Sequence, residues 1–102
     1  MALGSTVIEG YQTHVVKGIA AMCKIWVTDE YGNYVTGNNN YHKCDSGSLT
    51  IDTLSNDTYW LVVRVEGSLR KNKHRGPFNQ DTCYYVYGAV DNWHLNTDEY
   101  CE

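Results

Sequence analysis

The sequence predicts an all-β protein, a small disulfide-stabilised antiparallel β-sandwich of about seven strands. Its 102 residues fit a single domain spanning 1–102. Val, Ile and Thr together number 23 and Tyr adds 9, and branched and aromatic side chains favour a pleated sheet. Short alternating segments are separated by turns rich in Gly and Asn, a pattern typical of sandwiches and small barrels.

The first expected strand covers 14–28, with a bend or bulge at Gly18 because the segment is long for one strand. A shorter strand is expected over 48–54, another over 83–90, and a fringe strand over 6–8. Alternation predicts that the first strand turns one apolar face inward, formed by Val15, Ile19, Ala21, Cys23, Ile25 and Val27.

The clearest strand is 59–66, where apolar residues recur at every second position. Side chains alternate between the two faces of a strand, so one face is wholly apolar and the other is mixed. The inward set is Tyr59, Leu61, Val63 and Val65, and the outward set is Trp60, Val62, Arg64 and Glu66.

Gly, Asn and Asp mark the connections between these strands. We expect a tight turn at 29–33, a loop at 37–40, a hairpin turn at 55–57 and a long loop over 67–80.

Four cysteines in a chain of this length predict two disulfides and a secreted, extracellular protein. Of the three possible connectivities we favour Cys23–Cys44 with Cys83–Cys101, because each pair closes a loop of about 20 residues. The alternative is four reduced, buried thiols in a cytosolic protein. Asn56 begins an Asn-Asp-Thr sequon at an expected turn, which predicts a glycosylation site.

Charge and hydropathy restrict the classes of partner. The net charge of −4 argues against nucleic-acid binding, and the apolar runs are too short for a membrane span. No secretory leader opens the chain, so an exported protein is expected here in its mature form. The cysteines lack C-x-x-C spacing and the four histidines lack metal-ligand spacing, so we expect no metal and no other cofactor.

Part of the chain resembles prealbumin-like modules, which include the carboxypeptidase-regulatory-like and Cna protein B-type domains. The segment 27–37 is similar to their V-x-D-x-x-G-x-x-V-x-G opening. The segment 47–54 followed by 59–63 resembles their G-x-F-x-I-x-x-L … Y-x-L-x-V hairpin, so the resemblance covers roughly 23–66.

The resemblance implies an immunoglobulin-like or prealbumin-like sandwich with a non-enzymatic role as an extracellular spacer, adhesive unit or binding domain. Many Cna protein B-type domains carry a Lys–Asn isopeptide bond formed with a catalytic Glu. Lys24 is placed for such a bond, but Val63 stands where that Glu is expected, and the resemblance therefore implies no isopeptide here.

A basic segment is the first candidate binding site. Half of the eight Lys and Arg residues fall within six positions, at Arg70, Lys71, Lys73 and Arg75. Clustered cations on a net acidic protein predict contact with an acidic protein surface or an anionic glycan. The alternative is a solvated loop without a partner. Self-association is a further hypothesis, because the chain ends in an acidic stretch that holds Asp91, Asp98, Glu99 and Glu102.

Aromatic side chains form the second candidate site. Trp26 and Trp60 are expected on strand faces that point away from the core, where they are available to sugar rings or to a protein partner. The alternative is that the two indoles pack a second core or shield a sheet face.

The leading hypothesis is therefore an extracellular, non-enzymatic binding or structural module, such as an adhesion or matrix subunit. The alternative from another class is a small secreted hydrolase of ribonuclease type. His42, Glu66 and His94, with Arg64 or Arg70, supply the base, acid and cation that such an enzyme needs.

Overall fold

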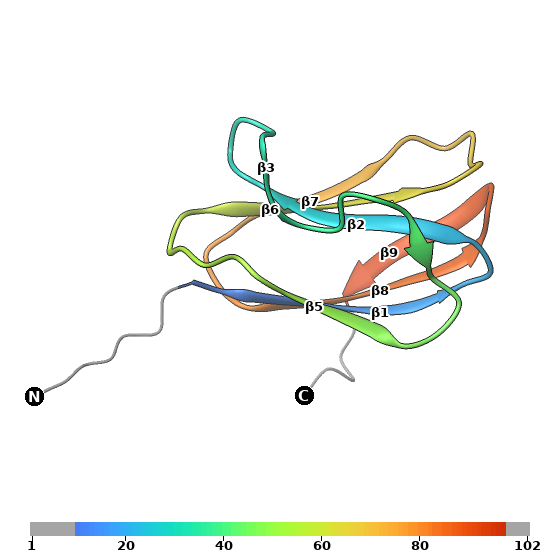
Figure 1. The fold of residues 1–102 in the computed structure, drawn as a ribbon, viewed down its shortest axis with the longest axis horizontal. Coiled ribbons are helices and arrows are strands. Elements are labelled where there is room, and N and C mark those ends of the chain that lie inside the picture. The colour runs from blue at the N-terminus through green and yellow to red at the C-terminus, as the bar shows by residue number, and fades with distance from the viewer. Residues whose placement is uncertain (1–9, 98–102) are drawn as a thin grey trace, which may run out of the picture.

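The computed structural model describes residues 10–97, and this part of the chain is all-β without a helix, as predicted (Figure 1). Nothing in the described range is a helix long and apolar enough to cross a membrane. The strands are β1 Gln12–Ile19, β2 Met22–Thr28, β3 Tyr34–Gly37, β4 His42–Lys43, β5 Ser48–Asp52, β6 Tyr59–Val65, β7 Lys73–Phe78, β8 Thr82–Ala89 and β9 Asn92–Thr97. One sheet has the strand order β5-β1-β8-β9, and the other has the order β3-β2-β6-β7 with β4 also paired to β2.

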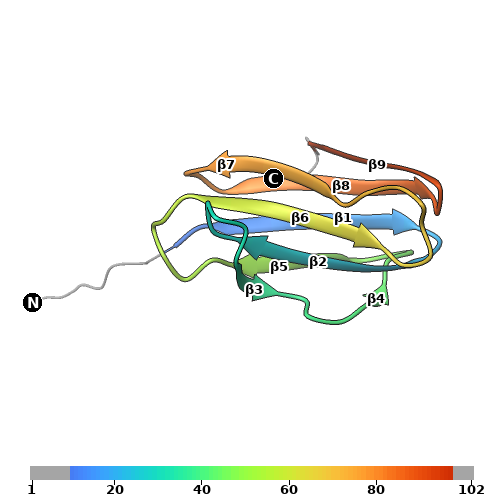
Figure 2. The same cartoon turned by 90° about the horizontal axis from the view of Figure 1, so that it is seen from above.

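The two sheets stack as layers, and β7 and β9 lie along the same side of the sandwich (Figures 1 and 2). Strand pairs are antiparallel except β1 and β8, which run parallel in the middle of the four-stranded sheet. The predicted antiparallel sandwich is therefore confirmed in every strand pair of the described residues except this one. A parallel pair needs a long crossover, and here the connection from β1 to β8 contains every strand of the second sheet together with β5.

The long strand expected over 14–28 is two strands in different sheets, β1 and β2. The chain changes sheet at Ala20 and Ala21, not at Gly18. The apolar alternation continues across this turn because both strands face the same core. Gly18 has a different role: a Cβ at this position would lie 2.8 Å from the Tyr85 ring, which covers the glycine.

Two predicted connections are corrected. The turn at 55–57 does not close a hairpin, because it leads from β5 in one sheet to β6 in the other. The long loop expected over 67–80 contains β7, which pairs with β6. Lys, Gly and Pro have low strand propensity, so only the available edge of β6 explains this strand. The fringe strand expected over 6–8 lies outside the described residues.

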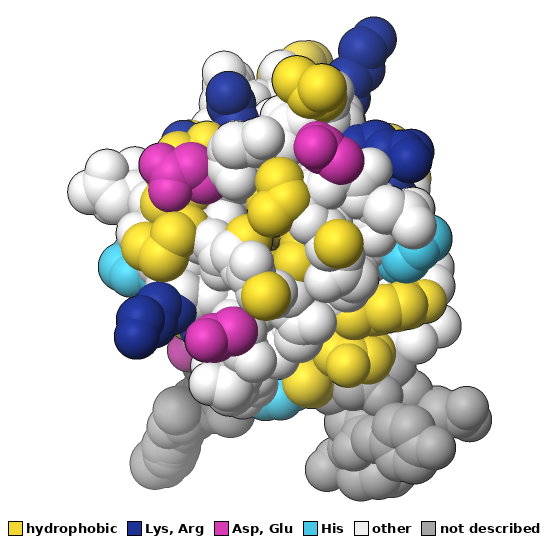
Figure 3. All heavy atoms as spheres, turned by 90° about the vertical axis from the view of Figure 1, so that its right-hand side faces the viewer, with side chains coloured by type: hydrophobic (Ala, Val, Ile, Leu, Met, Phe, Trp, Pro, Cys, Tyr) yellow, Lys and Arg dark blue, Asp and Glu magenta, His cyan; other side chains and the backbone are white. Residues whose placement is uncertain are grey.

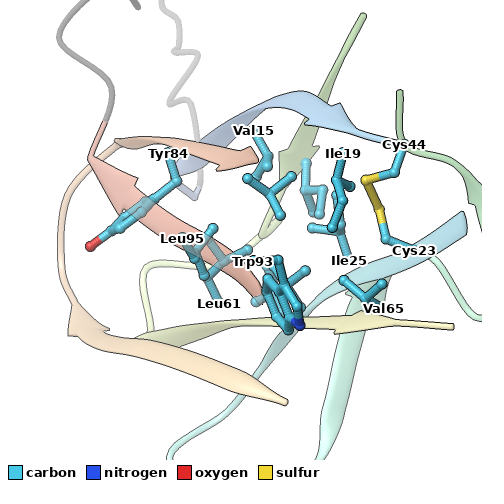
Figure 4. Packing of buried hydrophobic residues seen from close by; sticks show 14 of the residues in the cluster. Val15, Ile19, Cys23, Ile25, Cys44, Leu61, Val65, Tyr84, Trp93 and Leu95 are labelled. Atoms are coloured by element: carbon cyan, nitrogen blue, oxygen red, sulfur yellow. A yellow bond between two sulfur atoms is a disulfide. The ribbon is translucent and has the colours of Figure 1, made fainter. Parts of the chain in front are cut away.

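The core lies between the sheets and is closed at one end by a disulfide (Figure 4). Trp93 from β9 is 2% exposed and packs with Leu61, Val15 and other fully buried aliphatic side chains. The predicted Cys23–Cys44 disulfide is confirmed. The second predicted pairing involves Cys101, which lies outside the described residues, and remains a prediction.

The predicted faces of β6 are largely confirmed, since Leu61 and Val63 are fully buried and Arg64 is exposed. Val62 is the exception: it was predicted on the mixed, solvent-facing side and is only 1% exposed. Its register partners are Trp26 on β2 and His74 on β7, so large side chains flank it on the outer face.

Candidate functional site

The basic segment begins in the turn between β6 and β7. This turn presents Leu69, which is 92% exposed, beside the exposed Arg70 and Lys71. Asp91 in the β8–β9 turn fixes its shape, because the Asp91 carboxylate accepts from the Leu69 backbone N–H at 2.7 Å. The Asp91 carbonyl also accepts from Nε of Arg70 at 2.8 Å. Asp91, which the sequence offered as a contact for another copy, is thus engaged within its own chain.

Lys73 and Arg75, the other two predicted cations, lie on β7 in register with Val63 and Leu61, whose side chains face the core. The Lys73 ammonium lies 5.1 Å from the centroid of the Trp93 ring. The Arg75 guanidinium donates from Nη2 to the carbonyl of Leu95 at 2.9 Å, which ties β7 to β9 across the open side of the sandwich. Both cations therefore make contacts within the fold.

Figure 3 looks onto the end of the sandwich where the β6–β7 and β8–β9 turns lie. Lys and Arg side chains are scattered around this end, with Asp, Glu and apolar side chains between them.

Trp26 and Trp60 lie on the outer face of the five-stranded sheet, as predicted, and both are half-buried. They are diagonal neighbours, because Trp26 pairs with Val62 and Trp60 pairs with Thr28. Trp26 already has a partner, since the Lys24 ammonium lies 5.2 Å from its ring centroid.

The Trp60 indole packs against the backbone of Gly76 on β7. A Cβ at Gly76 would lie 2.8 Å from Cδ2 of the indole, so only glycine allows this approach. In front of the indole is an open pocket of about 220 Å³. Its lining comes from the β2–β3 turn and from neighbouring strands, and consists of Thr28, Asp29, Glu30, Gly32, Trp60 and His74.

Asp29 holds the β2–β3 turn in place. Its carboxylate accepts from the backbone N–H groups of Tyr31 and Asn33, both at 2.9 Å. The backbone N–H of Asn33 is the main reason why the pKa of the Asp29 carboxyl is lowered. Asp29 therefore contributes a fixed negative charge to the pocket, whereas Glu30 next to it is exposed.

The hairpin that carries this turn is unusually apolar on its surface. Tyr31 is 81% exposed, Tyr34 is 50% exposed and Val35 is 43% exposed. Exposed aromatic side chains clustered at one place are typical of interaction sites.

The residues proposed for a ribonuclease are not brought together. His42 lies on β4 beside β2, whereas His94 lies on β9 of the other sheet, at the opposite side of the sandwich. Across residues 10–97, His, Cys, Asp and Glu form no group of three or more suited to a metal ion. Asn56, the predicted glycosylation site, is exposed, and its Oδ1 accepts from the backbone N–H of Gly10.

Two features escaped the sequence analysis. His74 and Gly76 lie beside Trp60 only because β7 pairs with β6, and no pattern within either segment predicts that pairing. On the other sheet, Tyr87 stacks between Tyr85 and His94, with ring centroids 4.7 and 5.2 Å apart. The spacing of two residues between Tyr85 and Tyr87 is the signal that places both tyrosines on one face.

Neither a family model nor a curated protein matches this chain. The resemblance to prealbumin-like modules therefore remains a prediction.

Solved structures of two toxins share the fold. Pneumolysin is 10% identical with a TM-score of 0.59, over 87% of this chain and 23% of the toxin. Intermedilysin is 13% identical with a TM-score of 0.56, over 91% of this chain and 24% of the toxin. A disulfide-locked intermedilysin mutant solved with human CD59 is 12% identical, with a TM-score of 0.55 and the same two coverages. The chain thus spans about a quarter of the length of these toxins, and the likeness shows the fold alone.

Proposed function

We propose that this chain is an extracellular, non-enzymatic glycan-binding module whose ligand site is the pocket in front of Trp60. One observation carries the proposal: the Trp60 indole is held against Gly76 by close packing and lines a pocket beside polar groups. Aromatic rings offer apolar contact to sugar C–H groups, and the neighbouring polar side chains can bond sugar hydroxyls. A volume of about 220 Å³ is below the roughly 300–1,000 Å³ of drug-sized sites and suits about one sugar ring.

An extracellular location is supported by the Cys23–Cys44 disulfide, because such bonds persist in oxidising compartments. A non-enzymatic role is supported by the separation of His42 from His94, because two of the residues named for a ribonuclease lie on different sheets. The fold shared with two toxins is compatible with such a module.

Protein binding is the second candidate, and the exposed Tyr31, Tyr34 and Val35 favour it. Tyr and Trp are enriched at protein interfaces, where a few such residues provide most of the binding energy. The intermedilysin structure with human CD59 shows that a toxin with this fold in one part of its chain can form a complex with a protein.

The test is binding of the labelled protein to an array of neutral, amino and acidic oligosaccharides. We expect a defined set of glycans to bind and Trp60→Ala to abolish that binding. Trp26→Ala is the matched control, because it removes the same ring from the same sheet face but leaves the pocket intact. Absence of any bound glycan, or equal losses for the two variants, would contradict the proposal.

A further inference from the structure

Two of the three tryptophan rings in the described part of the chain have a lysine ammonium stacked over them. Lys24 lies 5.2 Å from the centroid of Trp26, and Lys73 lies 5.1 Å from the centroid of Trp93. Such contacts are attractive because the face of an indole is the negative end of its quadrupole. Among residues 10–97, Trp60 has no cation over its ring, although its ring lines an open pocket.

The groups around the Trp60 ring are of the opposite charge. Asp29 and Glu30 both line the pocket, the titratable His74 is the other ionisable residue of the lining, and no Lys or Arg lines it. The Asp29 carboxylate is occupied by the N–H groups of its own turn, so it supplies charge but not a new bond. Glu30 is exposed and makes no hydrogen bond within the described range, so its carboxylate is available to a ligand.

The cations of the same sheet lie elsewhere. Lys24 and Arg64 face each other across β2 and β6, four residues along each strand from the pair Thr28 and Trp60. Four residues of a strand span about 13 Å of backbone, and the Lys24 ammonium lies over the Trp26 ring and not over the Trp60 ring. Lys73 and Arg75 of β7 contact Trp93 and the Leu95 carbonyl instead.

From this arrangement we propose that the pocket binds an organic ammonium group, and specifically the free amine of an amino sugar. The ammonium lies over the Trp60 ring and donates a hydrogen bond to Glu30, while the sugar ring contacts the indole and the polar rim. Trp60 would thus contact the ammonium group of a ligand in the same way that Trp26 and Trp93 contact lysine side chains of this chain. This inference rests on the proposed glycan-binding function and narrows it to one ligand class.

The test compares two ligands that differ only at nitrogen: a glucosamine tetramer and its fully N-acetylated counterpart. Both are titrated into the 102-residue protein by calorimetry at pH 6 and low salt, where the free amine is protonated. We expect the amine form to bind about tenfold more tightly, as a cation–π contact and a charged hydrogen bond together allow. The preference should shrink as salt is raised.

Two variants assign the effect to its residues. Glu30→Gln is isosteric and removes only charge, so it should reduce the preference for the amine to the part that the cation–π contact with Trp60 supplies. Trp60→Ala should remove binding of both ligands, whereas Trp26→Ala should leave both affinities unchanged. A preference for the amine that is undiminished in Glu30→Gln would overturn the proposal.

The outcomes also separate this inference from the function on which it rests. If the two tetramers bound with equal affinity and both depended on Trp60, the proposed ammonium site would be overturned and the proposed glycan-binding function would stand. Failure of every glycan to bind would overturn both. Tetralysine is the last ligand tested. If it bound as tightly as the glucosamine tetramer and this binding were lost in Glu30→Gln, the ammonium group would come from a protein partner. That result would overturn the assignment of the ligand as an amino sugar.

Discussion

The phenol oxygen of Tyr59 lies 2.8 Å from the hydroxyl oxygen of Thr82, and this contact joins β6 of one sheet to β8 of the other. Tyr59 also donates to the carbonyl of Gln80 at 2.8 Å, and the hydroxyl oxygens of Thr82 and Thr13 lie 2.8 Å apart in hydrogen-bond contact. The core of the sandwich thus contains a polar chain that fixes the position of one sheet relative to the other.

Replacing Tyr59 with Phe should lower the free energy of unfolding by about 0.5–1.5 kcal/mol for each hydrogen bond lost. The ring remains, so packing against Tyr11 and Phe78 is kept. Urea denaturation measures the change, and Tyr31→Phe at the 81% exposed Tyr31 is the matched control. Equal stabilities of the two variants would contradict the role given to the Tyr59 hydroxyl.

The protein should lose stability as the pH rises above the ordinary tyrosine value of 10.0. Burial raises the pKa of Tyr59 and of Tyr84, so both stay protonated in the folded state while the unfolded chain ionises. The free energy of unfolding therefore falls as the pH rises above that value toward the raised pKa values of the folded state. Thermal unfolding between pH 8 and pH 11 checks this, and the fall should be smaller in Tyr59→Phe.

Removing the disulfide with the double change Cys23→Ala and Cys44→Ala should destabilise the fold by about 3 kcal/mol. The bond closes a loop with a sequence separation of 21, and such closure restricts the unfolded chain by about that amount. Denaturant titration in the absence of reductant measures the difference. A change of under about 0.5 kcal/mol, the usual size for a surface substitution, would show that the bond contributes nothing.

Truncating Leu61 to Ala should cost roughly 2–5 kcal/mol, because its side chain is fully buried between the sheets. Arg64→Ala on the same strand should stay within about 0.5 kcal/mol, because that side chain is exposed. Chemical denaturation of the two variants compares the two faces of β6. If Arg64→Ala were the more destabilised variant, the strand would be shifted by one residue.

Replacing Arg75 with Ala should increase aggregation more than it lowers stability. The guanidinium caps a carbonyl of β9, which is an edge strand, and exposed edges invite pairing with other chains. Light scattering at raised concentration measures the effect, with Arg64→Ala as the control that removes the same charge. Similar light scattering from the two variants would show that Arg75 does not protect the edge strand β9 from pairing with other chains.

The features that the sequence alone determined are those that depend on a pattern within a short segment. Alternation from Tyr59 to Val65 gave the buried face of β6, and loop length gave the Cys23–Cys44 pairing, because both depend on neighbouring positions or on the closure of one short loop. The outward direction of Trp26 and Trp60 follows from the same alternation.

Only the tertiary structure decided which strands share a sheet. The apolar pattern of 14–28 is the same for one strand or for two that face a common core, so the change of sheet at Ala20 and Ala21 leaves no trace in it. The segment 73–78 has weak strand propensity and becomes β7 because the edge of β6 offers backbone partners. That pairing turns Lys73 and Arg75 toward contacts within the fold and brings His74 and Gly76 to Trp60. The candidate site is thus made by contacts between distant segments, whose energy no local pattern records.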